Sequence, residues 1–109
     1  MKLENTKAQM RKGVLEFCIL SILKTGEAYT SDILERLKKA HLIVVEGTVY
    51  PLLTRLKNAD LLSYQWKESK SGPPRKYYSL TKPGNVFLEE LEAAWTDLVK
   101  AVRLTTKKK

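Results

Sequence analysis

The fold is decided by residues 46–80, EGTVYPLLTRLKNADLLSYQWKESKSGPPRKYYSL. The first part predicts a helix, because its apolar residues recur at the i, i+3, i+4 and i+7 spacing of one helix face. These residues are Val49, Leu52, Leu53 and Leu56. Residues 61–68 and 75–80 predict two strands, and the glycine and prolines of residues 69–74 predict a turn and exclude a strand there. A helix with a polar outward face followed by a cationic hairpin is typical of a winged helix-turn-helix. In that unit the helix enters a DNA major groove and the hairpin approaches the phosphates.

The outward face of the helix predicts base contacts. At about 100° per residue, four side chains project away from the apolar stripe. They are Thr48, Tyr50, Thr54 and Arg55. Arg55 suits a guanine edge or a phosphate, and Tyr50 suits backbone oxygens or a sugar. Pro51 is compatible with a helix that begins near residues 46–48, because the earliest helical amides have no intrahelical partner. The alternative for each residue alone is an ordinary solvated helix face.

The hairpin predicts a second set of DNA contacts. Its basic residues and a glycine surround the turn: Lys67, Lys70, Gly72, Arg75 and Lys76. Glycine lets the backbone approach the sugar-phosphate chain, and the cations neutralise phosphates or enter the minor groove. The alternative is a hairpin whose charges protect its edge from pairing with other chains. Tyr77 and Tyr78 must lie on opposite faces of their strand, so one is expected in the core.

The flanking segments predict further helices. Residues 7–24 predict one long helix that is apolar on most sides and ends at Gly26, and residues 30–40 predict a second helix with Thr30 as its N-cap. After the hairpin, Thr81 is expected to cap a last helix with Pro83 in its first turn. The predicted fold class is mainly α with a small β-hairpin (α+β).

The last helix carries an apolar seam with 3-4-3-4 spacing. Its members are Leu88, Leu91, Trp95, Leu98 and Val102. This spacing is that of the a and d positions of a coiled coil, although two heptads are too short for a free-standing one. The seam must pack on something, and we expect a second copy of the chain. We therefore divide the chain into a winged helix-turn-helix (residues 1–82) and a dimerisation helix with a basic tail (residues 83–109), within one compact unit.

Composition agrees with a polyanion-binding protein. The net charge is +8 from 20 basic and 12 acidic residues. Charge alone would also fit RNA or an anionic membrane as the partner. The arrangement of the motifs favours double-stranded DNA. The start of the chain is polar where a signal peptide would be apolar, and the longest apolar stretch, residues 14–23, has about half the length of a membrane helix. A cytoplasmic protein with no membrane partner is expected.

Catalytic and metal chemistry is not indicated. The chain has one histidine, His41, and one cysteine, Cys18, which cannot form a typical zinc site or an internal disulfide. Cys18 lies in an apolar segment and is expected to be a small buried residue, with a redox-sensing thiol as the alternative. We expect no enzyme activity and no cofactor.

Four segments together resemble the PadR family of bacterial transcriptional regulators. They are GVLEFCILSILKTGEAYTSDILERL (13–37), GTVYPLLTRLKNADLL (47–62), GPPRKYYSLTKPG (72–84) and LEELEAAWTDL (88–98). The resemblance implies a homodimer held by the C-terminal helix. It also implies a repressor that responds to small aromatic compounds, as small members with one C-terminal helix often do. In the family's multidrug-binding members a tryptophan at the position of Trp95 stacks flat ligands across the dimer. The hypothetical ligand site here is Met10, Phe17, Leu91 and Trp95, and the alternative for Trp95 is dimer packing.

The expected function is therefore a homodimeric, sequence-specific DNA-binding regulator of transcription that recognises an inverted-repeat operator. The alternative is a winged-helix module that binds another protein through Tyr50 and Trp66, with its charge serving solubility alone.

Overall fold

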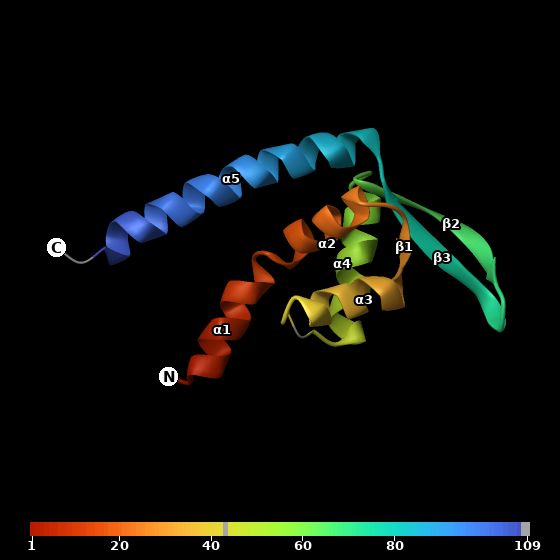
Figure 1. Ribbon diagram of the computed structural model, residues 1–109, viewed down its shortest axis with the longest axis horizontal. Coiled ribbons are helices and arrows are strands. Elements are labelled where there is room, and N and C mark those ends of the chain that lie inside the picture. Colours follow the sequence, from red (N-terminus) through yellow and green to blue (C-terminus); the bar gives the residue numbers. More distant parts are fainter. Residues whose placement is uncertain (43, 108–109) are drawn as a thin grey trace.

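The computed structural model describes residues 1–42 and 44–107 of the chain, and its fold is α+β as predicted. Helices and strands follow in the order α1 (Leu3–Lys12), α2 (Leu15–Lys24), β1 (Ala28–Tyr29), α3 (Thr30–Lys39), α4 (Glu46–Asn58), β2 (Leu62–Ser69), β3 (Gly72–Leu80) and α5 (Lys82–Thr106). Helices α2, α3 and α4 form the body, the β2–β3 hairpin projects from one side, and α5 extends past the body on the other (Figure 1). Lys108 and Lys109 of the basic tail lie outside the described residues.

The hairpin belongs to a three-stranded antiparallel sheet in the order β1-β3-β2. The central strand pairs Tyr78 with Ala28 on one side and with Tyr64 on the other. Strand β1 was not predicted, because two residues are too short to show an alternating pattern. Tyr78 is buried and Tyr77 is half-buried, so the expectation that they occupy opposite faces is confirmed.

The predicted start of the second strand at Arg75 was wrong. Strand β3 begins at Gly72 and runs through Pro73 and Pro74. Prolines are tolerated there because they lie at the tip of the hairpin, where the register shifts between Lys67 and Ser69 and the regular ladder is interrupted.

The prediction of one helix over residues 7–24 was also wrong. The chain forms α1 and α2, separated at Gly13 and Val14, and α1 begins at Leu3. Glycine is a poor helix former in a helix interior, and the two segments differ in burial. Helix α2 contributes five buried residues to the core, whereas α1 has none. The chain therefore bends at the point where it enters the core.

The two predicted N-caps had opposite outcomes. Helix α3 begins at Thr30 itself, with Tyr29 in the cap position and no side-chain cap. Thr30 cannot precede the helix because Tyr29 is still paired in β1, so the chain passes directly from strand to helix. Thr81 caps α5 as predicted: its Oγ1 accepts a hydrogen bond from the Gly84 amide at 3.0 Å, and Pro83 lies in the first turn.

The core lies where α2, α3, α4 and the sheet meet, and α5 contributes only its N-terminal part. Its fully buried side chains are Ile19, Leu20, Ile33, Leu37, Val49, Leu53 and Leu88. The predicted inward stripe of α4 is confirmed, with Leu52 half-buried and the other three members buried. Within the described residues, no helix combines the length and the apolar character of a membrane span.

Candidate nucleic-acid interface

A groove of about 440 Å³ separates the exposed face of α4 from the hairpin. Tyr50 and Thr54 line one wall, and Trp66, Arg75 and Lys76 line the other. The start of α3 also contributes to the groove, with Thr30 and Ser31. The structure thus brings together residues that the sequence predicted separately on the helix and on the hairpin.

The prediction missed two residues of α4 in this region: Glu46 lines the groove itself, and Lys57 lines an adjoining hollow together with Thr54. Tyr50, Thr54 and Lys57 follow the i, i+4, i+7 spacing of one face, and the Lys57 ammonium lies 5.9 Å from the centroid of the Tyr64 ring. The spacing from Tyr50 could have identified Lys57. Thr48 is exposed, but it does not line the groove.

Cations on the hairpin lie over aromatic rings. The Arg75 guanidinium is 4.7 Å from the centroid of Tyr29, and the Lys76 ammonium is 4.5 Å from that of Tyr64 and 5.4 Å from that of Trp66. Such cation–π contacts restrict long side chains without neutralising them. Two positive charges are therefore held at the wall of the groove, and this arrangement suits phosphate oxygens.

The other predicted hairpin residues do not line the groove. Lys67 forms an ion pair with Glu27 and lies 5.2 Å from the centroid of Tyr77, so its charge is partly compensated on the β1 side of the sheet. Lys70 and Gly72 are exposed at the tip, where the Ser69 hydroxyl donates to the carbonyl of Pro73 at 2.9 Å.

Arg55 lies on the side of α4 away from the hairpin. Its guanidinium Nη2 is 2.9 Å from a carboxylate oxygen of Glu16, in the first turn of α2. Local sequence patterns could not identify this partner, because 39 positions separate the two residues. The predicted base-contacting arginine is thus anchored at one end while its side chain stays largely exposed.

Helix α5 presents the predicted seam in two parts. Leu88 is fully buried in the core of its own chain and Leu91 is half-buried against that core, whereas Trp95, Leu98 and Val102 are exposed. The exposed part borders an apolar cavity of about 560 Å³ between α1 and α5, which Met10 also lines. Phe17 lies beside this cavity, with its ring centroid 6.3 Å from that of Trp95.

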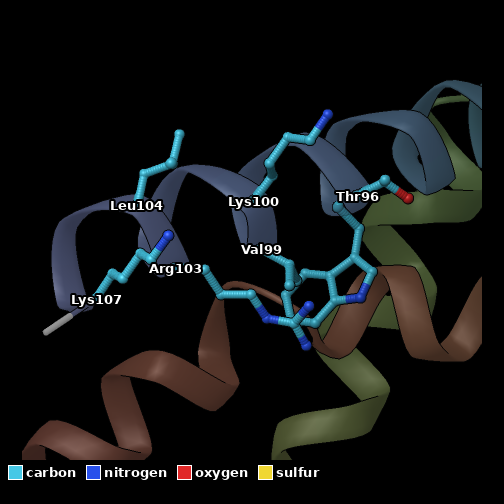
Figure 2. A pocket seen from close by; sticks show the side chains of 7 residues that line it. Thr96, Val99, Lys100, Arg103, Leu104 and Lys107 are labelled. Carbon is cyan, nitrogen blue, oxygen red and sulfur yellow. The ribbon is translucent and has the colours of Figure 1, made fainter. Parts of the chain in front are cut away.

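A second hollow of about 400 Å³ lies on another face of α5 (Figure 2). Its labelled side chains come from the C-terminal half of α5, including Lys100 and Leu104, and from Lys107, which directly follows the helix. Because all its lining residues come from this one segment, no other part of the described chain covers this face of α5.

Residues suited to catalysis or metal binding do not gather in the part of the chain that is described. There, no three His, Cys, Asp or Glu side chains are placed to hold a metal ion. Cys18 is partly buried, and desolvation raises the pKa of its thiol, which disfavours a reactive thiolate.

Comparison with known proteins gives a consistent family assignment. A sequence model described as the transcriptional regulator PadR-like family matches residues 19–90. A PadR-like transcription factor from Bacteroides fragilis, solved by X-ray crystallography, is 62% identical. The match covers 94% of this chain and 99% of that one, with a TM-score of 0.78. A PadR-like regulator from Bacillus cereus is 38% identical over 93% and 99% of the two chains, with a TM-score of 0.83. A PadR family regulator from Eggerthella lenta is 32% identical over 97% and 94%, with a TM-score of 0.88.

The family assignment agrees with the groove between α4 and the hairpin, whose basic wall suits a nucleic acid. This chain therefore belongs to the PadR-like family of transcriptional regulators, and it is a DNA-binding regulator rather than an enzyme.

Proposed function

We propose that this protein is a homodimeric, sequence-specific repressor in the bacterial cytoplasm. The observation that carries the proposal is the groove in which Tyr50 and Thr54 of α4 face Arg75 and Lys76 of β3. In this arrangement α4 enters the major groove of double-stranded DNA and the hairpin contacts the adjacent phosphates. Repression then needs only that the bound protein occupy a promoter.

The exposed surface of the chain supports dimerisation. A compact monomer of 12.5 kDa exposes about 6,200 Å². This chain exposes 8355 Å², which is about 2,200 Å² more. Its radius of gyration is 15.9 Å, against about 13 Å for a compact domain of this size. The excess is in the range that one subunit buries in a permanent dimer.

The apolar residues of α5 indicate where the second copy binds. Trp95, Leu98 and Val102 expose large side chains along one helix, together with Met10 of α1. Exposed patches of this kind mark protein interfaces. We assign residues 83–109 to dimerisation and residues 1–82 to DNA binding. Leu88 and Leu91 support the interface indirectly by packing α5 against its own domain.

A two-fold dimer determines the form of the operator. Two copies of α4 related by a two-fold axis would meet successive major grooves about 34 Å apart, so the operator is an inverted repeat. Selection of binding sequences from a random duplex library, followed by gel shift, tests this directly. A palindromic site bound at salt concentrations that abolish binding to unrelated DNA is the expected result. Weak binding to every sequence with the same salt dependence would contradict the proposal.

Two variants separate the roles of helix and hairpin. Arg55→Ala should weaken operator binding and relax one base preference, because an arginine contact to guanine contributes about 1–3 kcal/mol of discrimination. Lys76→Ala should weaken binding to all sequences alike and reduce the salt slope by about one unit. Lys39→Ala, on the far end of α3 and paired with Glu35, provides a control of equal charge change.

The cavity between α1 and α5 supports a small aromatic effector. Its lining is largely apolar and includes Met10 and Trp95, and the Phe17 ring lies against Trp95. A planar ligand would stack on the indole and alter the packing of α5 in the dimer. Tryptophan fluorescence titrated with planar cationic and planar anionic aromatics tests this proposal, with Trp95→Ala as the control. A response that persists unchanged in Trp95→Ala would remove Trp95 from the site.

The family assignment argues against a module that binds only protein. Tyr50 and Trp66, the residues considered for such a contact, lie on opposite walls of the groove proposed for DNA. Their exposure is accounted for by nucleic-acid contact.

A further inference from the structure

The ion pair between Glu16 and Arg55 differs from the other ion pairs among the described residues. In those pairs both side chains are at least 41% exposed. Here the Arg55 side chain is 73% exposed and the Glu16 side chain only 25%. An exposed surface arginine is thus attached to a largely buried carboxylate.

The position of Glu16 is fixed by the core. It lies in the first turn of α2, between Leu15 and Ile19, which are both buried. A carboxylate at this end of a helix is also favoured by the helix dipole. The core also holds the backbone at Arg55, since Leu53 and Leu56 are buried. The two partners therefore differ in their side chains: the shorter and less exposed Glu16 side chain restrains the longer and more exposed arginine.

The contact leaves Arg55 able to bind a second group. A guanidinium has five N–H donors in a planar fork, and Glu16 is bonded through Nη2. Arg55 flanks the outward ridge of α4 on the side opposite to Tyr50, which lines the groove with the hairpin. The ridge of α4 is thus bordered by the hairpin on one side and by the first turn of α2 on the other.

We propose that Glu16 is a positioning residue for base recognition: it fixes the plane of the Arg55 guanidinium so that its free edge can meet a guanine in the major groove. The inference depends on the proposed function, because it assumes that α4 reads bases. A bidentate contact to guanine requires a defined orientation of the fork. An unrestrained arginine contacts the nearest phosphate equally well, and such a contact carries no sequence information.

Orientation and charge make different predictions for Glu16. As a charge alone, Glu16 repels DNA, and its removal would strengthen binding to every sequence equally. As a positioning residue, it lowers the affinity for wrong sequences more than for the operator. Removing it should therefore reduce the ratio of operator affinity to the affinity for an operator changed at the Arg55-dependent base pair.

Three variants distinguish these roles. Glu16→Gln removes the charge and keeps the shape. Glu16→Asp keeps the charge but shortens the side chain by one methylene, so the carboxylate no longer reaches Nη2 in the same geometry. Glu35→Gln, an exposed carboxylate of α3 paired with Lys39, gives the same charge change elsewhere in the domain. The affinity of each variant is measured for the selected operator and for the operator changed at one base pair. Each Glu16 or Glu35 substitution is made both in the wild-type protein and in the Arg55→Ala variant. Thermal unfolding shows whether each variant is folded.

We expect both Glu16→Gln and Glu16→Asp to reduce discrimination at that base pair by about fivefold or more. Glu35→Gln should leave it unchanged, and neither Glu16 variant should alter it in the Arg55→Ala background. The inference would be overturned by two results together. Glu16→Asp would discriminate between the two sequences as well as the wild type does, and Glu16→Gln would bind both sequences more tightly by the same factor. Glu16 would then act on DNA binding through its charge alone. If Arg55→Ala keeps every base preference of the wild type, the inference about Glu16 also fails, but the proposed function as a DNA-binding regulator is unaffected. If the wild type selects no sequence at all, the proposed function fails with it.

Discussion

Replacement of Gly84 by alanine should destabilise this protein, although alanine is the better helix former. A Cβ atom at this position would overlap the carbonyl oxygen of Leu61 and lie 3.0 Å from its carbon and 3.2 Å from a methyl group of Leu80. The same Leu61 carbonyl accepts a hydrogen bond from the Thr81 amide at 3.2 Å. The start of α5 would therefore have to move away from Leu61, the residue directly before β2.

The magnitude follows from three contributions. Overpacking costs about 1–3 kcal/mol, and weakening the Thr81–Leu61 hydrogen bond costs about 1 kcal/mol. Alanine lowers the conformational entropy of the unfolded chain, which stabilises the folded state by about 0.4–1 kcal/mol. The net loss is about 2 kcal/mol. With an unfolding entropy of about 2.1 cal/mol/K per residue, this corresponds to a fall in Tm of about 9 °C for 109 residues.

Gly47 provides a matched control. It also lies in the first turn of a helix, but a Cβ there would have no atom within 4 Å. Gly47→Ala should raise the Tm by about 2–4 °C through the entropy term alone. Both variants are measured by circular dichroism at one protein concentration, because the stability of a dimer depends on concentration. A Gly84→Ala protein as stable as Gly47→Ala would refute the close approach of α5 to Leu61.

Three further predictions address other parts of the molecule. Leu98→Glu should make the protein monomeric in sedimentation velocity, because it places a charge in the exposed apolar face of α5 that we propose as the dimer interface, whereas Thr105→Glu near the end of α5 should leave the wild-type sedimentation unchanged. Arg75→Gln should lower the salt slope of DNA binding by about one unit without changing the preferred sequence, and a changed sequence preference would contradict its assignment to phosphate. Burial raises the pKa of Cys18 from its ordinary value of 9.0, so the unfolded thiol ionises first and the stability contributed by Cys18 is lost as the pH rises above about 9. Urea midpoints at pH 8 and pH 10.5 should therefore fall less in Cys18→Ala than in the wild type, and an equal fall would show that the thiol does not contribute.

Several elements were predictable because their signal is local. The inward face of α4 follows from the spacing of its leucines, and Thr81 is recognisable as a cap because Pro83 and an apolar helical pattern follow it. The alternation of Tyr77 and Tyr78 needs only the two-residue period of a strand. The DNA-binding role that we propose for the α4–hairpin unit was inferred from the order and charge of adjacent segments, which a sequence displays directly.

Other predictions failed where tertiary contacts override local preference. The bend at Gly13 depends on α2 entering the core while α1 follows a different surface, and a continuous apolar pattern cannot reveal that difference. Thr30 has the chemistry of a cap, but pairing of Tyr29 with Tyr77 in the sheet extends the strand up to the helix. Pro73 and Pro74 are tolerated in β3 because the ladder is irregular at the hairpin tip.

The sequence by itself determined helices α3, α4 and α5, the presence of the hairpin and the sign of the net charge, because each depends on neighbours within a few residues or on composition. Only the tertiary structure decided which charges are already paired: Arg55 with Glu16, and Lys67 with Glu27. It also decided that Leu88 belongs to the core of its own chain and that Trp95 lies against Phe17 at the edge of an open cavity. These relations join residues that are far apart along the chain, and the periodicity of one segment carries no information about the side chains that another segment brings to it.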